Sequence, residues 1–323
     1  MISTRFSRAA VAAVAAVGLI ALAGCSATPA ESDSKGDSAA ASTSEWPEKL
    51  TFAQIPSESA TGIAEDNANI LALLEKELGV EVELQEVTSY AAVIEALRAG
   101  QVQIAGMGPF SYVVAQDGGA GVLPLGALAD SADEEPGYQS YAIVNPDSGI
   151  TDLAGFKGKK VCFVDPTSTS GYLFPSAGLL ELGFDLEKDI TPVMAGGHDA
   201  SALSVADGTC DAGFAFDTMV TDQLIKSGQL KDGDVKVVWE SEVIPGSPYV
   251  ASTQLPEDLQ KELTRIFQEQ LNKPALVEAG ICTSEADCLL PEESEFGFIA
   301  VDDSLYDGIR AVCDVTKAES CVS

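Results

Sequence analysis

Positive charge is scarce in this chain. Its 323 residues include 18 Lys and Arg against 50 Asp and Glu, which gives a formal net charge of -32. Nucleic acids and anionic membrane surfaces are bound by clustered Lys and Arg, so this composition argues against both classes of partner. A small ligand stays possible, because a few local donors determine such a site rather than the net charge.

Metal-ligating and hydrolase motifs are also scarce. His198 is the only histidine, and the chain has no CxxC pair of the kind that is typical of zinc sites, so we expect no metal centre and no cofactor. The GxSxG turn of many serine hydrolases is missing as well. A catalytic triad would need a carboxylate that orients His198, and an acid next to it in the sequence, such as Asp199, rarely has that geometry. A secreted phosphoester hydrolase is therefore the less favoured interpretation, and we expect that the protein is not an enzyme.

A long apolar run occurs at the N-terminus and nowhere else. Residues 9–23 are apolar apart from Gly18, a length that suits a signal-peptide core but is short for a membrane span. The run ends in Leu22-Ala23-Gly24-Cys25, which resembles a bacterial lipobox. We predict that residues 1–24 are a lipoprotein signal peptide and that Cys25 is lipidated, which places the protein on the extracytoplasmic face of the cell membrane. An ordinary secretory signal with a chance cysteine is the alternative.

The remaining cysteines predict disulfides. Without Cys25 the chain has six, an even number in an exported protein. Six cysteines permit about 15 pairings, so sequence cannot fix the connectivity. Cys282–Cys288 and Cys313–Cys321 are favoured because the two cysteines of each pair are close in the chain. Cys162–Cys210 is favoured because both cysteines lie on expected strands of the same part of the fold.

The part after the signal reads as a tethered α/β protein. Residues 25–48 are mostly small and polar, as expected of a flexible tether. After them, apolar periodicity alternates between strand and helix, and the same plan recurs after residue 160. The expected strands are 50–55, 80–87, 102–105, 160–164, 190–194, 211–216, 235–239 and 249–252. The expected helices are 64–78, 90–99, one from 109, 171–182, 199–206, 218–226 and 256–271.

This alternation predicts two α/β lobes with mostly parallel sheets. Ligands of such folds bind at the carboxyl ends of the strands, here in a cleft between the lobes. We expect the first lobe to contain residues 49–137 and 248–323 and the second to contain 138–247. Crossing segments are expected near 138–144 and 244–251, and the C-terminal segment is expected to pack back on the first lobe.

The run from Asp165 to Pro175 is the strongest candidate for a binding site. It follows an expected strand, opens a helix and contains Ser168, Thr169, Ser170 and Gly171. Consecutive hydroxyls, unpaired backbone N–H groups and the positive end of a helix together make an anion site. A plain helix cap without a ligand is the alternative interpretation.

Other turns offer further donors. Residues 195–201 also join a strand to a helix, and there His198 can donate to an oxyanion while Asp199 can cap the helix. The turn that contains Gly108 and the helix that begins at Tyr90 offer groups from the first lobe. Taken alone, His198 and Asp199 are as consistent with a capping acid beside a surface histidine as with a binding site, whereas Gly108 and Tyr90 are more often packing residues than binding residues.

Five runs in order give a specific resemblance. They are TSYAAVIEALRAGQVQIAGMGPFSY, EEPGYQSYAIV, VDPTSTSGYLFP, AGGHDAS and SEVIPGSPYV. This part of the chain, about residues 50–271, resembles the phosphate/phosphite/phosphonate substrate-binding proteins of ABC transporters. The resemblance implies a type-II periplasmic-binding-protein fold and a monomer that works with a permease and an ATPase. It also implies that the oxyanion is held by Ser168, Thr169, Ser170, His198 and Tyr90, with Tyr138 near the cleft.

One departure from the family bears on the ligand. Members that bind aminophosphonates place carboxylates near the amine, whereas here the corresponding turn has neutral Ser247 and Asp217 is the acid nearby. We therefore expect phosphate, phosphite or a small alkylphosphonate. Asp199 is the expected acceptor for a P–OH group, which sulfate lacks. A sensory protein that presents the same ligand to a membrane receptor is equally compatible with these residues.

Overall fold

A compact unit spans Ser44–Ser323, and the computed structural model describes residues 46–322 of it. The predicted signal peptide and the predicted lipidation at Cys25 lie outside the described residues. The last residues of the predicted tether are described, and there Trp46 Nε1 donates to Asp258 Oδ2 at 3.0 Å. Because the Trp46 ring also packs against a hydrophobic core, this residue already belongs to the folded part. No helix within 46–322 is long and apolar enough to cross a membrane.

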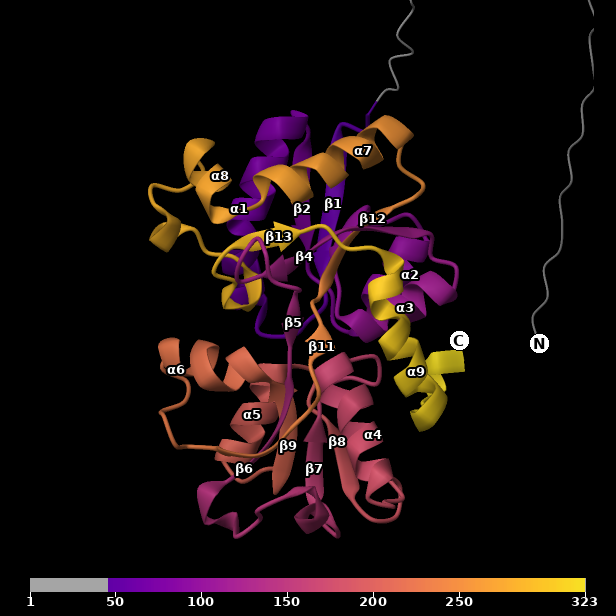
Figure 1. Ribbon diagram of the computed structural model, residues 1–323, viewed down its shortest axis with the longest axis vertical. Coiled ribbons are helices and arrows are strands. Elements are labelled where there is room, and N and C mark those ends of the chain that lie inside the picture. Colours follow the sequence, from indigo (N-terminus) through magenta and orange to yellow (C-terminus); the bar gives the residue numbers. More distant parts are fainter. Residues whose placement is uncertain (1–45, 323) are drawn as a thin grey trace, which may run out of the picture. The chain divides into compact units, whose positions relative to one another are not determined.

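The strands within residues 46–322 form three sheets (Figure 1). The largest has the order β13-β4-β12-β3-β1-β2, and we call this sheet with its helices lobe 1. The second has the order β10-β6-β9-β7-β8 and belongs to lobe 2, while β5 and β11 pair with each other. The bounds are β1 Lys49–Gln54, β2 Glu81–Gln85, β3 Ile104–Gly106, β4 Val122–Ala129, β5 Gly137–Tyr138, β6 Ser140–Val144, β7 Lys160–Phe163, β8 Thr191–Met194, β9 Ala212–Phe216, β10 Lys236–Glu240, β11 Ile244–Pro245, β12 Pro248–Ser252 and β13 Gly297–Ile299.

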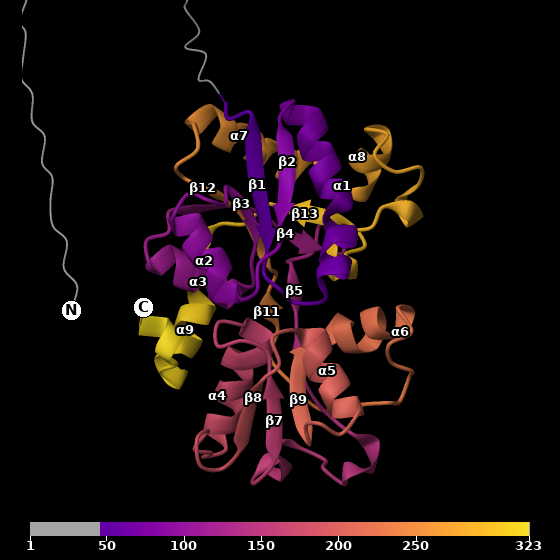
Figure 2. The same cartoon turned by 180° about the vertical axis from the view of Figure 1, so that it is seen from behind.

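Helices cover both sheets (Figures 1 and 2). Those of lobe 1 are α1 Ala60–Leu78, α2 Tyr90–Arg98, α3 Pro109–Asp117, α7 Glu257–Arg265 and α8 Lys273–Glu278. Those of lobe 2 are α4 Phe174–Glu181, α5 His198–Ala206 and α6 Leu224–Lys226, and α9 Asp307–Thr316 follows β13. One turn of π-helix precedes α4, another precedes α6 and a third follows α7, so the helices expected at 171–182, 218–226 and 256–271 contain irregular turns.

Local sequence signals explain where α1 begins and ends. Ser59 is its N-cap and accepts a hydrogen bond from Gly62 N at 3.3 Å. Gly79 ends the helix in the left-handed region, at φ 67°. Between them Ile70, Leu74 and other apolar side chains repeat at helical spacing and are fully buried against the sheet of lobe 1.

Both sheets are mixed, which corrects the expectation of mostly parallel sheets. β1 runs parallel to β2 and β3, and β7 runs parallel to β8 and β9, as expected. β12 is antiparallel to β3 and β4, and β6 is antiparallel to β9 and β10. The chain leaves lobe 1 after β4 and returns to it in β12, and it enters lobe 2 in β6 and leaves after β10. β4 therefore runs towards the segments that join the lobes and β12 runs away from them, while β6 and β10 have the same relation in lobe 2, so each of these two pairs is antiparallel.

The link between the lobes is narrower than expected. β5 pairs antiparallel with β11, so that Tyr138 lies opposite Ile244. Residues 140–144 already form β6 of lobe 2, and residues 248–252 already form β12 of lobe 1. Two short adjacent segments are the usual structure of a hinge between lobes that close on a ligand.

The C-terminal segment packs on lobe 1, as expected, but it also reaches lobe 2. β13 extends the sheet of lobe 1 by pairing with β4. Helix α9 then packs against α3 of lobe 1 and against α4 of lobe 2, and both views show it beside the two lobes. The Tyr306 ring lies 4.8 Å from the Tyr112 ring, and Arg310 pairs with Asp117 at 3.0 Å, which fixes α9 to α3.

The three predicted disulfides are present among the described residues. Cys162 in β7 is joined to Cys210 just before β9, with 5.9 Å between their Cα atoms. Cys282–Cys288 and Cys313–Cys321 close short loops in the C-terminal part of the chain. The first bridge ties together two neighbouring strands of lobe 2 whose ends lead to the candidate site.

Candidate functional site

The turn after β7 forms the cap of the helix that follows. Asp165 Oδ1 accepts hydrogen bonds from Thr167 N and Thr167 Oγ1, both at 2.8 Å. Ser168 is the N-cap, and its Oγ accepts from Gly171 N at 3.1 Å. Gly171 is required there, because a Cβ atom would lie 2.4 Å from Val164. The turn thus presents three successive buried hydroxyl residues, those at 168–170, at the positive end of a helix.

His198 is buried beside this turn and is held in one tautomer. Its Nδ1 accepts a hydrogen bond from Phe216 N at 3.1 Å, so the proton of the neutral ring lies on Nε2. Nε2 faces Ser168 Oγ at 3.4 Å. Burial lowers the pKa of His198 to about 3, so the ring is a neutral donor at physiological pH. The partner of Nδ1 is a backbone N–H, so the carboxylate that a catalytic triad requires is not at that nitrogen.

The two lobes touch at these two turns. Phe110 N at the start of α3 donates to Thr169 Oγ1 at 2.8 Å. His198 N at the start of α5 donates to Ser57 O, in the loop after β1, at 2.7 Å. Both bonds join lobe 1 to lobe 2, so the candidate residues of each lobe are brought together around one space.

That space is a cavity of about 20 Å³ between the lobes. It has room for a small compact group rather than for an extended ligand. Two buried polar atoms that line it, Tyr90 Oη and Gln54 Oε1, have no hydrogen-bond partner among the described residues. Buried polar groups are normally paired, so these two point to a polar ligand. The lining residues are Gln54, Ile55, Ser57, Tyr90, Gly108, Tyr138, Ser168, Thr169, Ser170, His198, Phe216, Ser247 and Glu292.

Most of the residues that the sequence selected line this cavity. They are Tyr90, Gly108, Tyr138, Ser168, Thr169, Ser170, His198 and Ser247. Gly171 lies behind the turn and supports it through its bond to Ser168. Asp199 and Asp217 are outside the cavity lining, so the acid that the sequence reasoning expected at a P–OH group is not in contact with this space.

Asp199 also does not cap α5. The helix begins one residue earlier than expected, at His198, and its N-cap is Gly197, which offers no side-chain bond. Asp199 lies in the first turn, where its Oδ1 accepts from Ala200 N at 2.7 Å. Across the lobe boundary it faces Glu58, whose pKa is raised to about 8 because its carboxyl is buried and because Asp66 and Asp199 are negative.

Glu292 lines the cavity, and sequence reasoning missed it. It lies in the short 3-10 turn Pro291–Glu293, where both glutamates adopt the left-handed region, with φ 58° and 60°. Such non-glycine residues cost about 1–3 kcal/mol each and often mark functional sites. Thr218 Oγ1 of lobe 2 donates to Glu292 O at 3.5 Å. No motif marks this residue, because it lies in the tail outside the family resemblance.

The surroundings of Glu292 favour its protonated form. Burial raises the pKa of its carboxyl to about 7, and the negative charges of Asp217, Asp130 and Asp66 act in the same direction. A hydrogen bond with Ser247 acts in the opposite direction, because it stabilises the ionised form. Ser247 itself is neutral, but the carboxyl group of Glu292 therefore lies beside it.

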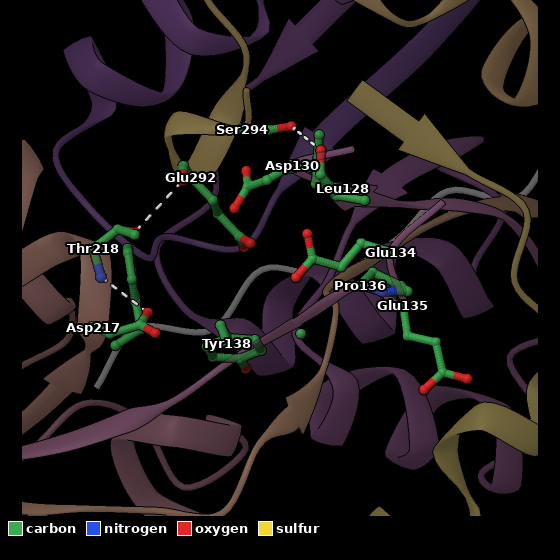
Figure 3. A pocket seen from close by; sticks show the side chains of 13 residues that line it. Leu128, Asp130, Glu134, Glu135, Pro136, Tyr138, Asp217, Thr218, Glu292 and Ser294 are labelled. Atoms are coloured by element: carbon green, nitrogen blue, oxygen red, sulfur yellow. Dashed lines mark hydrogen bonds between the residues drawn. The ribbon is translucent and has the colours of Figure 1, made fainter. Parts of the chain in front are cut away.

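A second, acidic cavity of about 120 Å³ adjoins the first. Tyr138, Phe216 and Glu292 line both cavities. Figure 3 shows Asp130 and Glu134 beside Glu292, with Asp217 and Thr218 on the side of lobe 2. The full lining is Leu128, Ala129, Asp130, Glu134, Glu135, Pro136, Gly137, Tyr138, Phe216, Asp217, Thr218, Glu292 and Ser294.

Backbone N–H groups bind two of the acids of this second cavity. Asp217 accepts from Gln139 N and Thr218 N, both at 2.9 Å. Asp130 Oδ1 accepts from Glu295 N at 3.0 Å. Asp130, Glu134 and Glu135 are exposed, so water solvates them at the rim.

Comparisons with known proteins agree with this geometry. The profile of the family described as ABC transporter, phosphonate, periplasmic substrate-binding protein matches residues 52–281. The phosphate-import protein PhnD of Mycolicibacterium smegmatis is 43% identical over 308 residues, which cover 93% of this chain and 96% of that protein. The phosphonates-binding periplasmic protein of Escherichia coli is 32% identical over 229 residues, which cover 70% of this chain and 67% of that protein.

Solved structures share the same fold. A binding protein component of an ABC phosphonate transporter from Pseudomonas aeruginosa superposes with a TM-score of 0.72 at 27% identity, over 84% of this chain and 87% of that one. PhnD1 of Prochlorococcus marinus, solved with methylphosphonate, gives a TM-score of 0.68 at 20% identity, over 84% of this chain and 99% of that one. The predicted type-II fold is therefore confirmed. This chain belongs to the periplasmic substrate-binding proteins of phosphonate-type ABC transporters, and its family binds substrates rather than catalysing reactions.

Proposed function

We propose that this chain captures a small phosphorus oxyanion (phosphate, phosphite or a phosphonate) in the cavity between the lobes and delivers it to the permease and ATPase of an ABC importer. The names of its relatives in Mycolicibacterium smegmatis and Escherichia coli support this ligand class. The observation that carries the proposal is the set of neutral donors that converge on one small buried space.

The hydrogen-bond directions around that space support an anion. Ser168 Oγ and Thr169 Oγ1 each accept a bond from a backbone N–H, so each hydroxyl hydrogen is available to a ligand. His198 Nε2 carries a proton, and Tyr90 Oη lacks a partner among the described residues. Neutral donors suffice to hold an oxyanion, because they are preorganised and the helix end adds a favourable field.

We further propose that capture is coupled to lobe closure. The proposed division assigns 49–137 and 248–323 to one lobe and 138–247 to the other. Opening about β5 and β11 would separate Thr169 and His198 from their partners Phe110 and Ser57 and admit the ligand.

At the membrane we propose the arrangement that the N-terminal sequence predicts. Residues 1–24 would be removed as a signal, and lipidated Cys25 would hold a monomer near its permease through the tether 25–48. Fractionation of cells that express Cys25→Ser tests the anchor, because retention of this variant in membranes would contradict it.

Removal of one cavity hydroxyl should weaken ligand binding selectively. We expect Ser170→Ala to lower the affinity for phosphate or methylphosphonate by about 5- to 100-fold, because a charged ligand loses one donor. The control is Thr167→Ala in the same turn, since Thr167 bonds Asp165 and does not line the cavity. Titration calorimetry measures both. Equal losses in the two variants, or no binding of any phosphorus oxyanion by the unaltered protein, would contradict the proposed function.

A further inference from the structure

The cavity between the lobes brings one carboxyl group to the oxyanion donors. Glu292 is the one acid among the described residues that line it, and none of these lining residues is Lys or Arg. A carboxylate and an oxyanion repel each other when no cation lies near them. Their contact is favourable only when one proton lies between a Glu292 oxygen and a ligand oxygen.

We propose that Glu292 determines ligand selectivity by sharing one proton with the ligand, so that oxyanions with a P–OH group are accepted and sulfate is disfavoured. This inference rests on the proposed function, because it concerns the same cavity. The proton belongs either to the ligand, which then donates to the carboxylate, or to Glu292, which then donates to the oxyanion. The hydrogen bond is the same in both forms, and one proton is required in each.

Among the described groups around Glu292, none is a cation that could neutralise its contact with an oxyanion, so a proton has to do so. Lys226 on α6 lies beside Glu293, the residue after Glu292. Its ammonium group is already engaged, because it pairs with Glu293 at 2.7 Å and with Asp222 at 3.7 Å. Ser247 bonds the Glu292 carboxyl, and His198 is neutral. The titratable groups that face Glu292 from the surrounding elements are Glu58, Asp66, Tyr90, Asp130, Glu134, Glu135, Tyr138, His198, Asp217, Tyr249 and Tyr306.

A ligand ammonium group would be the other way to neutralise Glu292. The adjoining acidic cavity is less suited to this, because backbone N–H groups already use one position on each Asp217 oxygen and one on Asp130. Glu134 and Glu135 are exposed and solvated. A desolvated ammonium needs several unengaged acceptors, and here Glu292 itself is the acid that reaches the oxyanion cavity.

Proton uptake on binding gives a direct test in the unaltered protein. At pH 8.5 phosphate still carries a P–OH group, whereas methylphosphonate and sulfate carry none. We expect binding to take up about one proton with methylphosphonate or sulfate and almost none with phosphate, as linkage requires. Calorimetry in buffers of different ionisation enthalpy measures this number. Equal uptake with all three ligands would overturn the proposal, and this test does not depend on any variant being folded.

Glu292→Gln is the matching variant. Its amide donates without a proton from solvent, so we expect sulfate to bind about tenfold or more tightly at pH 8.5 than it binds the unaltered protein. We also expect the uptake of protons to vanish. Glu295→Gln is the control, because it removes one exposed charge from the same segment and does not line the cavity. The proposal predicts no change in selectivity for this control.

Three other outcomes are informative. An unchanged preference between phosphate and sulfate in Glu292→Gln would overturn the inference but leave the proposed function intact. Tightest binding of 2-aminoethylphosphonate, lost in Glu292→Gln, would also overturn it and would make Glu292 an amine ligand. Failure of the unaltered protein to bind any phosphorus oxyanion would overturn the proposed function, and the inference with it.

Discussion

Single residues of the site act through the neighbours that fix their protonation. His198 is a donor because Phe216 N occupies its other nitrogen, and because burial lowers its pKa to about 3. Glu292 exchanges its proton close to neutral pH, because burial raises its pKa to about 7. In the proposed function, a neutral imidazole and a carboxyl group that is easily protonated together allow an acidic protein to bind an anion.

The histidine prediction can be checked without mutation. Because His198 is the only histidine of the chain, its imidazole signals in proton NMR need no assignment by variants. We expect no titration between about pH 8 and pH 5, since its pKa lies near 3 in the folded protein. The same signals in urea-unfolded protein serve as the control and should titrate near pH 6.5. A midpoint above pH 6 in the folded protein would contradict the assigned neutral donor.

At the scale of elements, the ends of β7 and β9 carry the site. β7 leads into the turn with Ser168, β9 ends at Phe216, and the two strands are parallel neighbours. The bridge Cys162–Cys210 ties β7 to the segment just before β9, across a separation of 48 residues. The bridge therefore restricts the relative movement of the two strands that position the donors.

Loop length predicts which disulfide matters most for stability. The chain-entropy model gives about 4 kcal/mol for the Cys162–Cys210 loop and about 2–3 kcal/mol for Cys313–Cys321, which spans 8 residues. We expect the double variant Cys162→Ala/Cys210→Ala to lose more free energy of unfolding than Cys313→Ala/Cys321→Ala. Urea denaturation of both variants measures the difference. A larger loss in the tail variant would show that packing of α9, rather than loop entropy, dominates.

At the scale of the whole described molecule, the C-terminal segment links the lobes. The turn at Pro291–Glu293 approaches lobe 2 through Thr218 and Lys226, and α9 packs on both lobes. These contacts join the two lobes in the arrangement described here, which we take as the closed one in the proposed function. Any of them that is lost on opening favours the closed state and therefore slows ligand release.

The pair between Lys226 and Glu293 allows this to be tested. Lys226→Ala should weaken ligand affinity by about two- to fivefold, mostly through faster dissociation, because an exposed ion pair contributes about 0.2–1 kcal/mol. Lys231→Ala removes an exposed lysine from the same lobe and is the control. Stopped-flow dissociation at low and high salt measures both, and the effect should shrink at high salt. Equal rates in the two variants would mean that the pair does not contribute to closure.

The local parts of the fold could be predicted from the sequence. Strand and helix periodicity located β1, β7, α1 and α2 to within a few residues, because capping residues and apolar spacing act over short distances. The turn at 168–171 and His198 were found for the same reason, since each follows a strand and opens a helix. β4, β13, α8 and α9 were not predicted, and their positions depend on how the chain crosses between the lobes.

The sequence by itself thus determined the family to which the chain belongs, and it predicted the donors that we propose for the site. Tertiary structure alone decided the acceptor, because Glu292 is brought to Ser247 and Tyr138 by a return of the chain over more than 40 residues. It also decided that Asp199, adjacent to His198, stays outside the cavity, since the helix that carries both turns them in different directions. Short-range rules identify residues that can donate, whereas packing over long range determines which acid meets them.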